Sequence, residues 1–76
     1  MNTDDRRFLE QVGFRVRERR LARNLTQAQL AAACGLHRTF VGSVERGERN
    51  LALLSLRKIA AALRATPAAL LADDPG

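Results

Sequence analysis

Arginine is the side chain with which this sequence is best equipped for chemistry, and three arginines fall within one segment, GLHRTFVGSVERGERN (residues 35–50). The planar guanidinium donates two parallel hydrogen bonds to a phosphate or to the edge of a guanine base. The net charge is +5 with an isoelectric point of about 11.3, and arginines outnumber glutamates between residues 15 and 49. This balance predicts an anionic polymer or a membrane surface as the partner.

The sequence has few residues that could form a disulfide, a metal site or a catalytic cluster. The single cysteine, Cys34, excludes an internal disulfide and a multi-cysteine metal site, and the single histidine, His37, argues against a catalytic cluster. No carboxylate pair, cysteine–histidine set or glycine-rich phosphate loop is apparent. We therefore predict that the protein is not an enzyme and needs no metal or cofactor. No signal peptide is visible and no apolar run approaches the roughly 20 residues of a membrane span, so a cytoplasmic location without membrane attachment is expected.

The elements that must position the arginines are all helical. Alanine and leucine dominate and β-branched residues are few. Asn24 is suited to a left-handed helix terminus, Thr26 and Thr66 to N-caps, and Gly35 to a turn with positive φ. We predict a single domain, residues 1–76, with five helices at about 4–23, 27–34, 37–46, 53–63 and 67–71.

Apolar spacing predicts how these helices pack. Residues 27–46 satisfy the pattern of two helices joined by a tight turn, with seven matching positions: Leu30, Ala31, Cys34, Gly35, Leu36, Val41 and Val44. In the first helix, Leu9, Val12 and Val16 share one face beside Gly13, which would permit close packing. Phe14 and Leu21 lie nearly opposite, which predicts that this helix is covered on both sides. The fourth helix is expected to bury Leu53, Leu56, Ile59, Ala60 and Leu63.

A helical wheel of the third helix places one set of residues on an outward arc: Arg38, Thr39, Gly42, Ser43 and Arg46. A glycine inside a helix costs about 0.5–1 kcal/mol relative to alanine. Its smallness would let the backbone come near the floor of a groove. The alternative is a solvated basic face that merely tolerates a glycine.

The segment LTQAQLAAACGLHRTFVGSVERGERN resembles the Xre (Cro/C1-type) helix-turn-helix family. Within that family, HRTFVGSVERGERNLALLSLRKIAAAL is most similar to the small controller proteins of restriction–modification systems. The likeness covers about residues 8–71. It implies an all-α, five-helix, lambda-repressor-like domain that binds a pseudo-palindromic operator in double-stranded DNA as a homodimer. Controllers of this kind activate and repress their own gene and a neighbouring endonuclease gene.

The resemblance also implies roles for individual residues. Arg38, Thr39 and Ser43 match positions that contact bases. The positions that match backbone contacts are Gln27, Arg46, Arg49 and Asn50. Arg20 and Glu45 match a buried structural ion pair that sets the angle of the recognition helix. The sequence departs from the family pattern at Asn24, which replaces the usual glycine, and at His37, where small or acidic residues are common.

Four leucines have no place in the predicted core. They predict a dimer interface on the last two helices, at about residues 53–72. They are Leu51, Leu54, Leu70 and Leu71. The alternative is that they close the monomer core against Phe14 and Leu21. An activator would also contact RNA polymerase, for which the sequence singles out no surface. An antitoxin or phage-type repressor of the same fold, and a protein-interaction module, remain alternative functions that neighbouring genes and DNA-binding assays would distinguish.

Overall fold

The computed structural model describes residues 2–72, so the two ends of the predicted domain, residue 1 and residues 73–76, lie outside the description. Within the described range the chain forms five helices and no strand. They are α1 (Thr3–Ala22), α2 (Gln27–Cys34), α3 (Arg38–Glu45), α4 (Leu53–Ala62) and α5 (Pro67–Leu71). The predicted all-α, five-helix fold is confirmed, and the predicted boundaries agree within about two residues.

The helix ends follow from local side-chain chemistry. Thr26 and Gln29 form a reciprocal capping box at the start of α2, with the Thr26 hydroxyl accepting from the Gln29 amide at 3.0 Å. At the start of α5 the Thr66 hydroxyl accepts from the Ala69 amide at 3.1 Å, ahead of a proline at the first helical position. Asn24 and Gly35 adopt the left-handed conformation, with φ of 57° and 68°. The predicted terminators and caps at these positions are confirmed.

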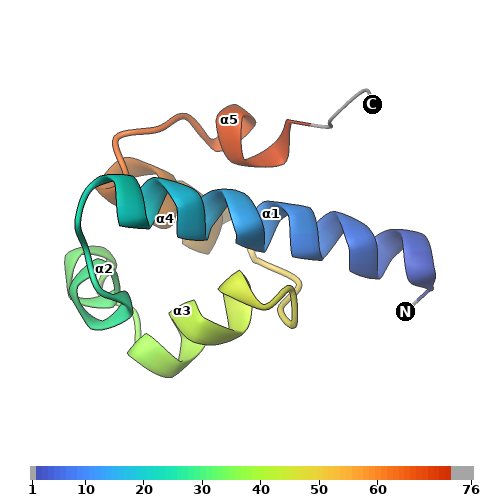
Figure 1. Ribbon diagram of the computed structural model, residues 1–76, viewed down its shortest axis with the longest axis horizontal. Coiled ribbons are helices and arrows are strands. Elements are labelled where there is room, and N and C mark those ends of the chain that lie inside the picture. Colours follow the sequence, from blue (N-terminus) through green and yellow to red (C-terminus); the bar gives the residue numbers. More distant parts are fainter. Residues whose placement is uncertain (1, 73–76) are drawn as a thin grey trace.

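Figure 1 shows α1 as a long central helix, with α2 and α3 on one side and α5 on the other. The helix contacts α3 and α5, while α2 contacts both α3 and α4. The buried core gathers apolar side chains from all five helices: Val12, Val16, Leu30, Ala31, Cys34, Val41, Val44, Leu56, Ile59, Ala60, Leu63 and Leu70. Most of these were predicted from spacing. None of the described helices is long and apolar enough to cross a membrane.

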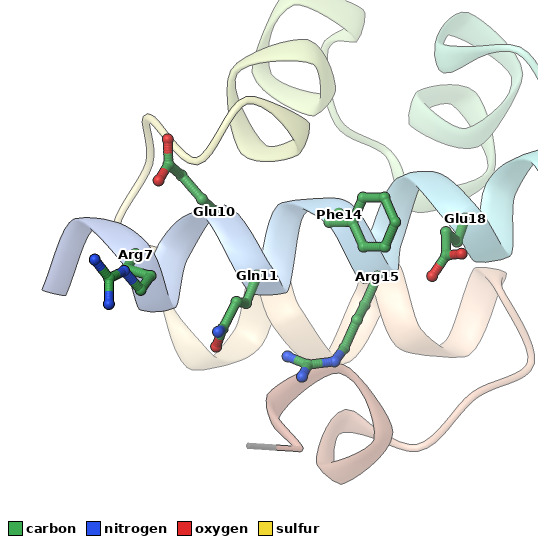
Figure 2. Close-up of a pocket in the computed structure, with 6 residues that line it drawn as sticks. All are labelled: Arg7, Glu10, Gln11, Phe14, Arg15 and Glu18. Carbon is green, nitrogen blue, oxygen red and sulfur yellow. The ribbon is translucent and has the colours of Figure 1, made fainter. Parts of the chain in front are cut away.

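Three apolar side chains predicted to be covered are exposed instead. Leu53, expected in the core, is 80% exposed because it begins α4 before the helix reaches the core. Phe14 and Leu21 are about half exposed, so the prediction that their stripe is covered is wrong, although α1 does lie between α3 and α5 as predicted. Figure 2 shows Phe14 on the same side of α1 as Gln11 and Glu18, and α5 lies over another side of the helix.

Leu70 is the opposite case. The sequence predicts it as a dimer-interface residue, but its side chain is fully buried within the protomer. Because α5 packs against both α1 and α4, Leu70 closes the core between them. Its prediction as a dimer-interface residue is therefore wrong, whereas Leu54 and Leu71 remain exposed and Leu51 is half-buried.

Gly13 sets how closely α1 approaches α3. A Cβ atom at this position would lie 2.3 Å from the Val44 carbonyl oxygen and 2.7 Å from the Glu45 carbonyl oxygen. Both are backbone atoms at the end of α3, so they cannot yield without moving the helix. The prediction that Gly13 permits close packing is confirmed.

Replacing Gly13 with alanine is therefore expected to destabilise the domain by roughly 1–3 kcal/mol, although alanine is the better helix former. Gly42→Ala in α3 is the matched control. A Cβ there would meet only the ends of the flexible Arg46 and Gln27 side chains, at 3.2 and 3.3 Å. We expect the free energy of unfolding of the control, measured by urea denaturation, to stay within about 1 kcal/mol of the parent. Equal stability of the two variants would contradict this account of Gly13.

Candidate nucleic-acid interface

The candidate site is built on α2 and α3, which are joined by the turn at Gly35. Gly35 ends α2 in the left-handed conformation, and the Leu36 amide then bonds back to the Ala31 carbonyl at 2.9 Å. A side chain larger than alanine at position 31, which is 2% exposed, would have no room at this crossing. The turn therefore fixes one helix across the other.

Cys34 belongs to the core of this unit. Its thiol donates a 3.6 Å hydrogen bond to the Lys58 carbonyl, which ties α2 to α4. Burial raises the pKa of the Cys34 thiol, and nearby Lys58 only partly opposes that effect. The thiol therefore stays protonated and acts as a small core side chain.

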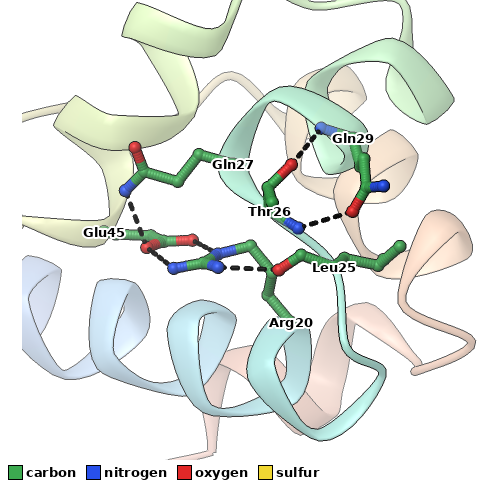
Figure 3. Close-up of polar contacts among 6 residues, drawn as sticks. All are labelled: Arg20, Leu25, Thr26, Gln27, Gln29 and Glu45. Carbon is green, nitrogen blue, oxygen red and sulfur yellow. Dashed lines mark hydrogen bonds and ion pairs between the residues drawn. The ribbon is translucent and has the colours of Figure 1, made fainter.

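A buried ion pair locks α3 onto α1 (Figure 3). The Arg20 guanidinium donates to both Glu45 carboxylate oxygens, at 2.6 Å and 2.9 Å, and to the Leu25 carbonyl at 2.8 Å. The Arg20 side chain is 9% exposed and that of Glu45 is 3% exposed. The hydrogen bond that Arg20 donates to Glu45 raises the pKa of Arg20 above its ordinary value, against the opposing effect of burial. The structure thus brings the predicted pair together.

Gln27 extends this network to the start of α2. Its amide nitrogen donates to Glu45 at 3.1 Å, as Figure 3 shows. Its amide oxygen lies over Gly42, where it shares the space above the backbone with the Arg46 guanidinium. The small size of Gly42 predicts that the helix backbone can come near the floor of a groove. That interpretation is wrong for this structure, because Gly42 is buried beneath the side chains of Gln27 and Arg46.

The exposed part of α3 is its first turn. His37 is the N-cap residue, and its ring nitrogen accepts a hydrogen bond from the Thr39 amide at 3.2 Å. Arg38 and Thr39 follow, and both are exposed. These are two of the three residues predicted to contact bases. The capping role of His37 was missed from sequence, although its place immediately before the third helix was a signal for it.

Ser43 lies elsewhere. It was predicted on the outward arc, but it is 8% exposed, and its hydroxyl donates to the Phe40 carbonyl at 2.7 Å. The same oxygen accepts from the Arg49 Nε at 3.1 Å. Ser43 is therefore not presented outward, and its predicted base contact is replaced by a positioning role for Arg49. The Arg49 guanidinium also lies over the Phe40 ring, 5.4 Å from its centroid.

The remaining predicted backbone contacts surround α3. Arg46 caps its C-terminus and pairs with Glu48 at 3.1 Å, in an exposed contact. The hydrogen bond from Arg46 holds the pKa of Glu48 below its ordinary value. Asn50 is exposed and borders the groove formed by Phe8 and Leu9, away from the start of α3. Within residues 2–72 no group of three potential metal-ligating side chains is found.

The turn at Gly35, the buried crossing of α2 over α3 and the exposed first turn of α3 define a helix-turn-helix domain. The helix-turn-helix family model matches residues 16–70. The chain belongs to the helix-turn-helix family.

The chain is similar to two control proteins and to one controller protein of known structure. The chain is 45% identical over 60 residues to the control protein C.BamHI of Bacillus amyloliquefaciens, covering 78% of this chain and 74% of that protein. It is 52% identical over 56 residues to the control protein C.SmaI of Serratia marcescens, covering 74% and 67%. The crystal structure of the restriction-modification controller protein C.AhdI from Aeromonas hydrophila superimposes with a TM-score of 0.79 at 47% identity, covering 82% of this chain and 94% of that chain.

Removing the Glu45 charge tests the lock between α1 and α3. Glu45→Gln leaves the Arg20 guanidinium buried without its counter-charge, and we expect a loss of about 3–5 kcal/mol in the free energy of unfolding. Glu48→Gln is the matched control, because it makes the same change in the exposed pair with Arg46. Urea denaturation followed by circular dichroism measures both. A loss as small for Glu45→Gln as for the control would show that the buried pair does not hold the helices together.

Proposed function

We propose that this chain is a transcriptional regulator that binds a pseudo-palindromic DNA operator as a homodimer and controls a restriction–modification system. The observation that carries the proposal is the first turn of α3, where Arg38 and Thr39 project from a helix whose other end is locked in the core. A recognition helix contacts base edges in the major groove with its N-terminal residues, and these two are free to do so.

The charge around α3 supports DNA as the anionic partner. Arg38, Arg46 and Arg49 lie at its start, its end and in the following loop, and all three are exposed. Arg38 suits guanine O6 and N7, whereas Arg46 and Arg49 suit phosphates. The N-terminus of α2 adds free amides that attract a phosphate beside Gln27. A regulator that reads DNA works in the compartment of the chromosome, which fits the predicted cytoplasmic location.

The restriction–modification role is supported by the similar proteins. Two curated relatives are control proteins, and the similar structure is a restriction-modification controller. Endonuclease and methyltransferase genes beside the gene for this chain would support the role, and a neighbouring toxin gene would instead indicate an antitoxin. RNA polymerase is retained as a partner for an activating role, in which the exposed face of α1 around Phe14 offers a surface outside α2 and α3.

The homodimer is supported by apolar surface at one end of the molecule. Leu53 and Leu54 at the start of α4 are 80% and 65% exposed, and Leu71 at the end of α5 is 38% exposed. Beside them is an apolar groove of about 110 Å³, whose lining includes Phe8, Leu51, Leu53 and Leu71. A symmetric contact through this end would bury these leucines and set two recognition helices about one DNA turn, roughly 34 Å, apart.

Arg38→Ala is expected to lower affinity for the operator by roughly 10- to 100-fold and to relax sequence preference, because a bidentate base contact is lost. Arg49→Ala should weaken binding to all sequences and reduce the slope of log affinity against log salt by about one. Fluorescence anisotropy across salt concentrations, with DNA from upstream of the gene, measures both effects. Arg7→Ala, an exposed arginine in α1 beside Phe14, is the control and should bind like the parent. An operator affinity and a sequence preference of Arg38→Ala that both match those of the parent would reject this role for α3.

Leu54→Glu and Leu53→Glu are expected to yield folded monomers, because each places a charge in the proposed interface while touching little of the core. Sedimentation velocity over a concentration series measures the association state. Phe14→Glu is the matched control, since Phe14 is also exposed but lies outside this apolar end. Dimers of undiminished strength in both leucine variants would place the interface elsewhere.

A further inference from the structure

The N-cap of the recognition helix is unusual. Serine, threonine, aspartate and asparagine are the common N-cap residues, because their oxygens accept a hydrogen bond from the first turn. Here His37 takes this place, and its Nδ1 accepts from the Thr39 amide at 3.2 Å. The Thr39 hydroxyl also contacts the same Nδ1 atom. The cap and the side chain expected to face DNA therefore meet at one nitrogen.

This geometry determines where the hydroxyl proton lies. An imidazole nitrogen that accepts from an amide N–H carries no proton of its own, so the neutral ring is protonated at Nε2. A hydroxyl beside an unprotonated nitrogen is attracted to it only as a donor. With the ring in this tautomer, the Thr39 hydroxyl donates a hydrogen bond to His37 Nδ1, and the lone pairs of its oxygen face outward.

We propose that His37 is a specificity-determining residue, which orients the Thr39 hydroxyl so that it reads hydrogen-bond donors on DNA bases. In the major groove these donors are the N6 amino group of adenine and the N4 amino group of cytosine. Without the cap, a freely rotating hydroxyl would also donate to guanine O6 or thymine O4. The inference rests on the proposed DNA-binding function. It adds that the Thr39 hydroxyl acts as a hydrogen-bond acceptor in its contact with a base.

The neighbouring side chain has the opposite polarity. Arg38 has only donors, so it reads acceptors such as guanine O6 and N7. Two consecutive residues of α3 thus present a donor fork and an oriented acceptor, which require different bases. Each half-site of the operator is expected to contain a guanine read by Arg38 and, at the position facing Thr39, an adenine or cytosine on the contacted strand.

The first test selects binding sites from a randomised DNA pool with the full chain and two variants of Thr39. The parent should prefer adenine or cytosine by roughly tenfold at one position of each half-site. Thr39→Val keeps the shape and a methyl group but removes the hydroxyl, and should lose this preference while the palindrome persists. Thr39→Ser keeps the hydroxyl and should retain it. An unchanged preference in Thr39→Val would overturn the inference and leave the proposed function standing.

The second test isolates His37. In His37→Ala the hydroxyl is released, and we expect thymine and guanine to be accepted at the same position to within about twofold of adenine and cytosine. Because this variant loses a helix cap, nitrogen chemical shifts of the His37 ring in the parent provide an independent readout. When the ring is neutral, the parent should carry its proton on Nε2 with Nδ1 unprotonated. A proton on Nδ1 would overturn the inference, whatever DNA binds.

The two tests also separate this inference from the proposed function. A parent protein that selects no sequence from the pool would refute the operator-binding proposal. The ring nitrogen shifts would still report, without DNA, whether His37 Nδ1 is unprotonated and can accept from Thr39.

Discussion

The bidentate ion pair between Arg20 and Glu45 is the interaction on which the rest of the structure depends. It joins the end of α1 to the end of α3, and both partners have further hydrogen bonds, to the Leu25 carbonyl and from Gln27. Burying two charges costs several kcal/mol each, which their attraction repays only when the geometry is good and the remaining polar atoms are satisfied. Its main consequence is therefore orientation: the pair holds the recognition helix at one angle to α1 and α2.

Close backbone packing enforces the same angle. Gly13 lets α1 touch the last carbonyls of α3, and a Cβ at Gly47 would come within 2.6–2.8 Å of Glu10 atoms. Two glycines, one in α1 and one just after α3, thus let main chain meet main chain at this crossing. Packed interiors yield little to such contacts, so α3 has no low-energy alternative position against α1. The C-terminal half of α3 is buried against the rest of the fold, and its N-terminal turn is exposed and accessible to a partner.

The sequence predicts most of the fold because local chemistry decides it. The roles of three residues follow from local properties alone. The side chains of Thr26 and Thr66 cap helices, and Gly35 readily adopts a positive φ. Positions that depend on a partner's location were harder. Leu53 and Leu56 have equivalent helical spacing, yet only Leu56 meets the core. A wheel of an eight-residue helix likewise could not show that Arg49, from the following loop, lies against Ser43 and turns its hydroxyl away from the outward face.

The small size of the exposed turn bears on why a dimer is needed. With Gly42 and Ser43 buried, the proposed direct readout of bases falls mainly to Arg38 and Thr39. Two base contacts at about 1–3 kcal/mol each give one protomer only a few kcal/mol of discrimination. Specific DNA binding typically exceeds nonspecific binding by about 4–10 kcal/mol. A single copy therefore reaches only the lower part of that range, whereas two copies on a palindrome double the base contacts. The packing that locks α3 in place thus limits what one domain can read, and in the proposed dimer it makes the exposed leucines of α4 part of the recognition mechanism.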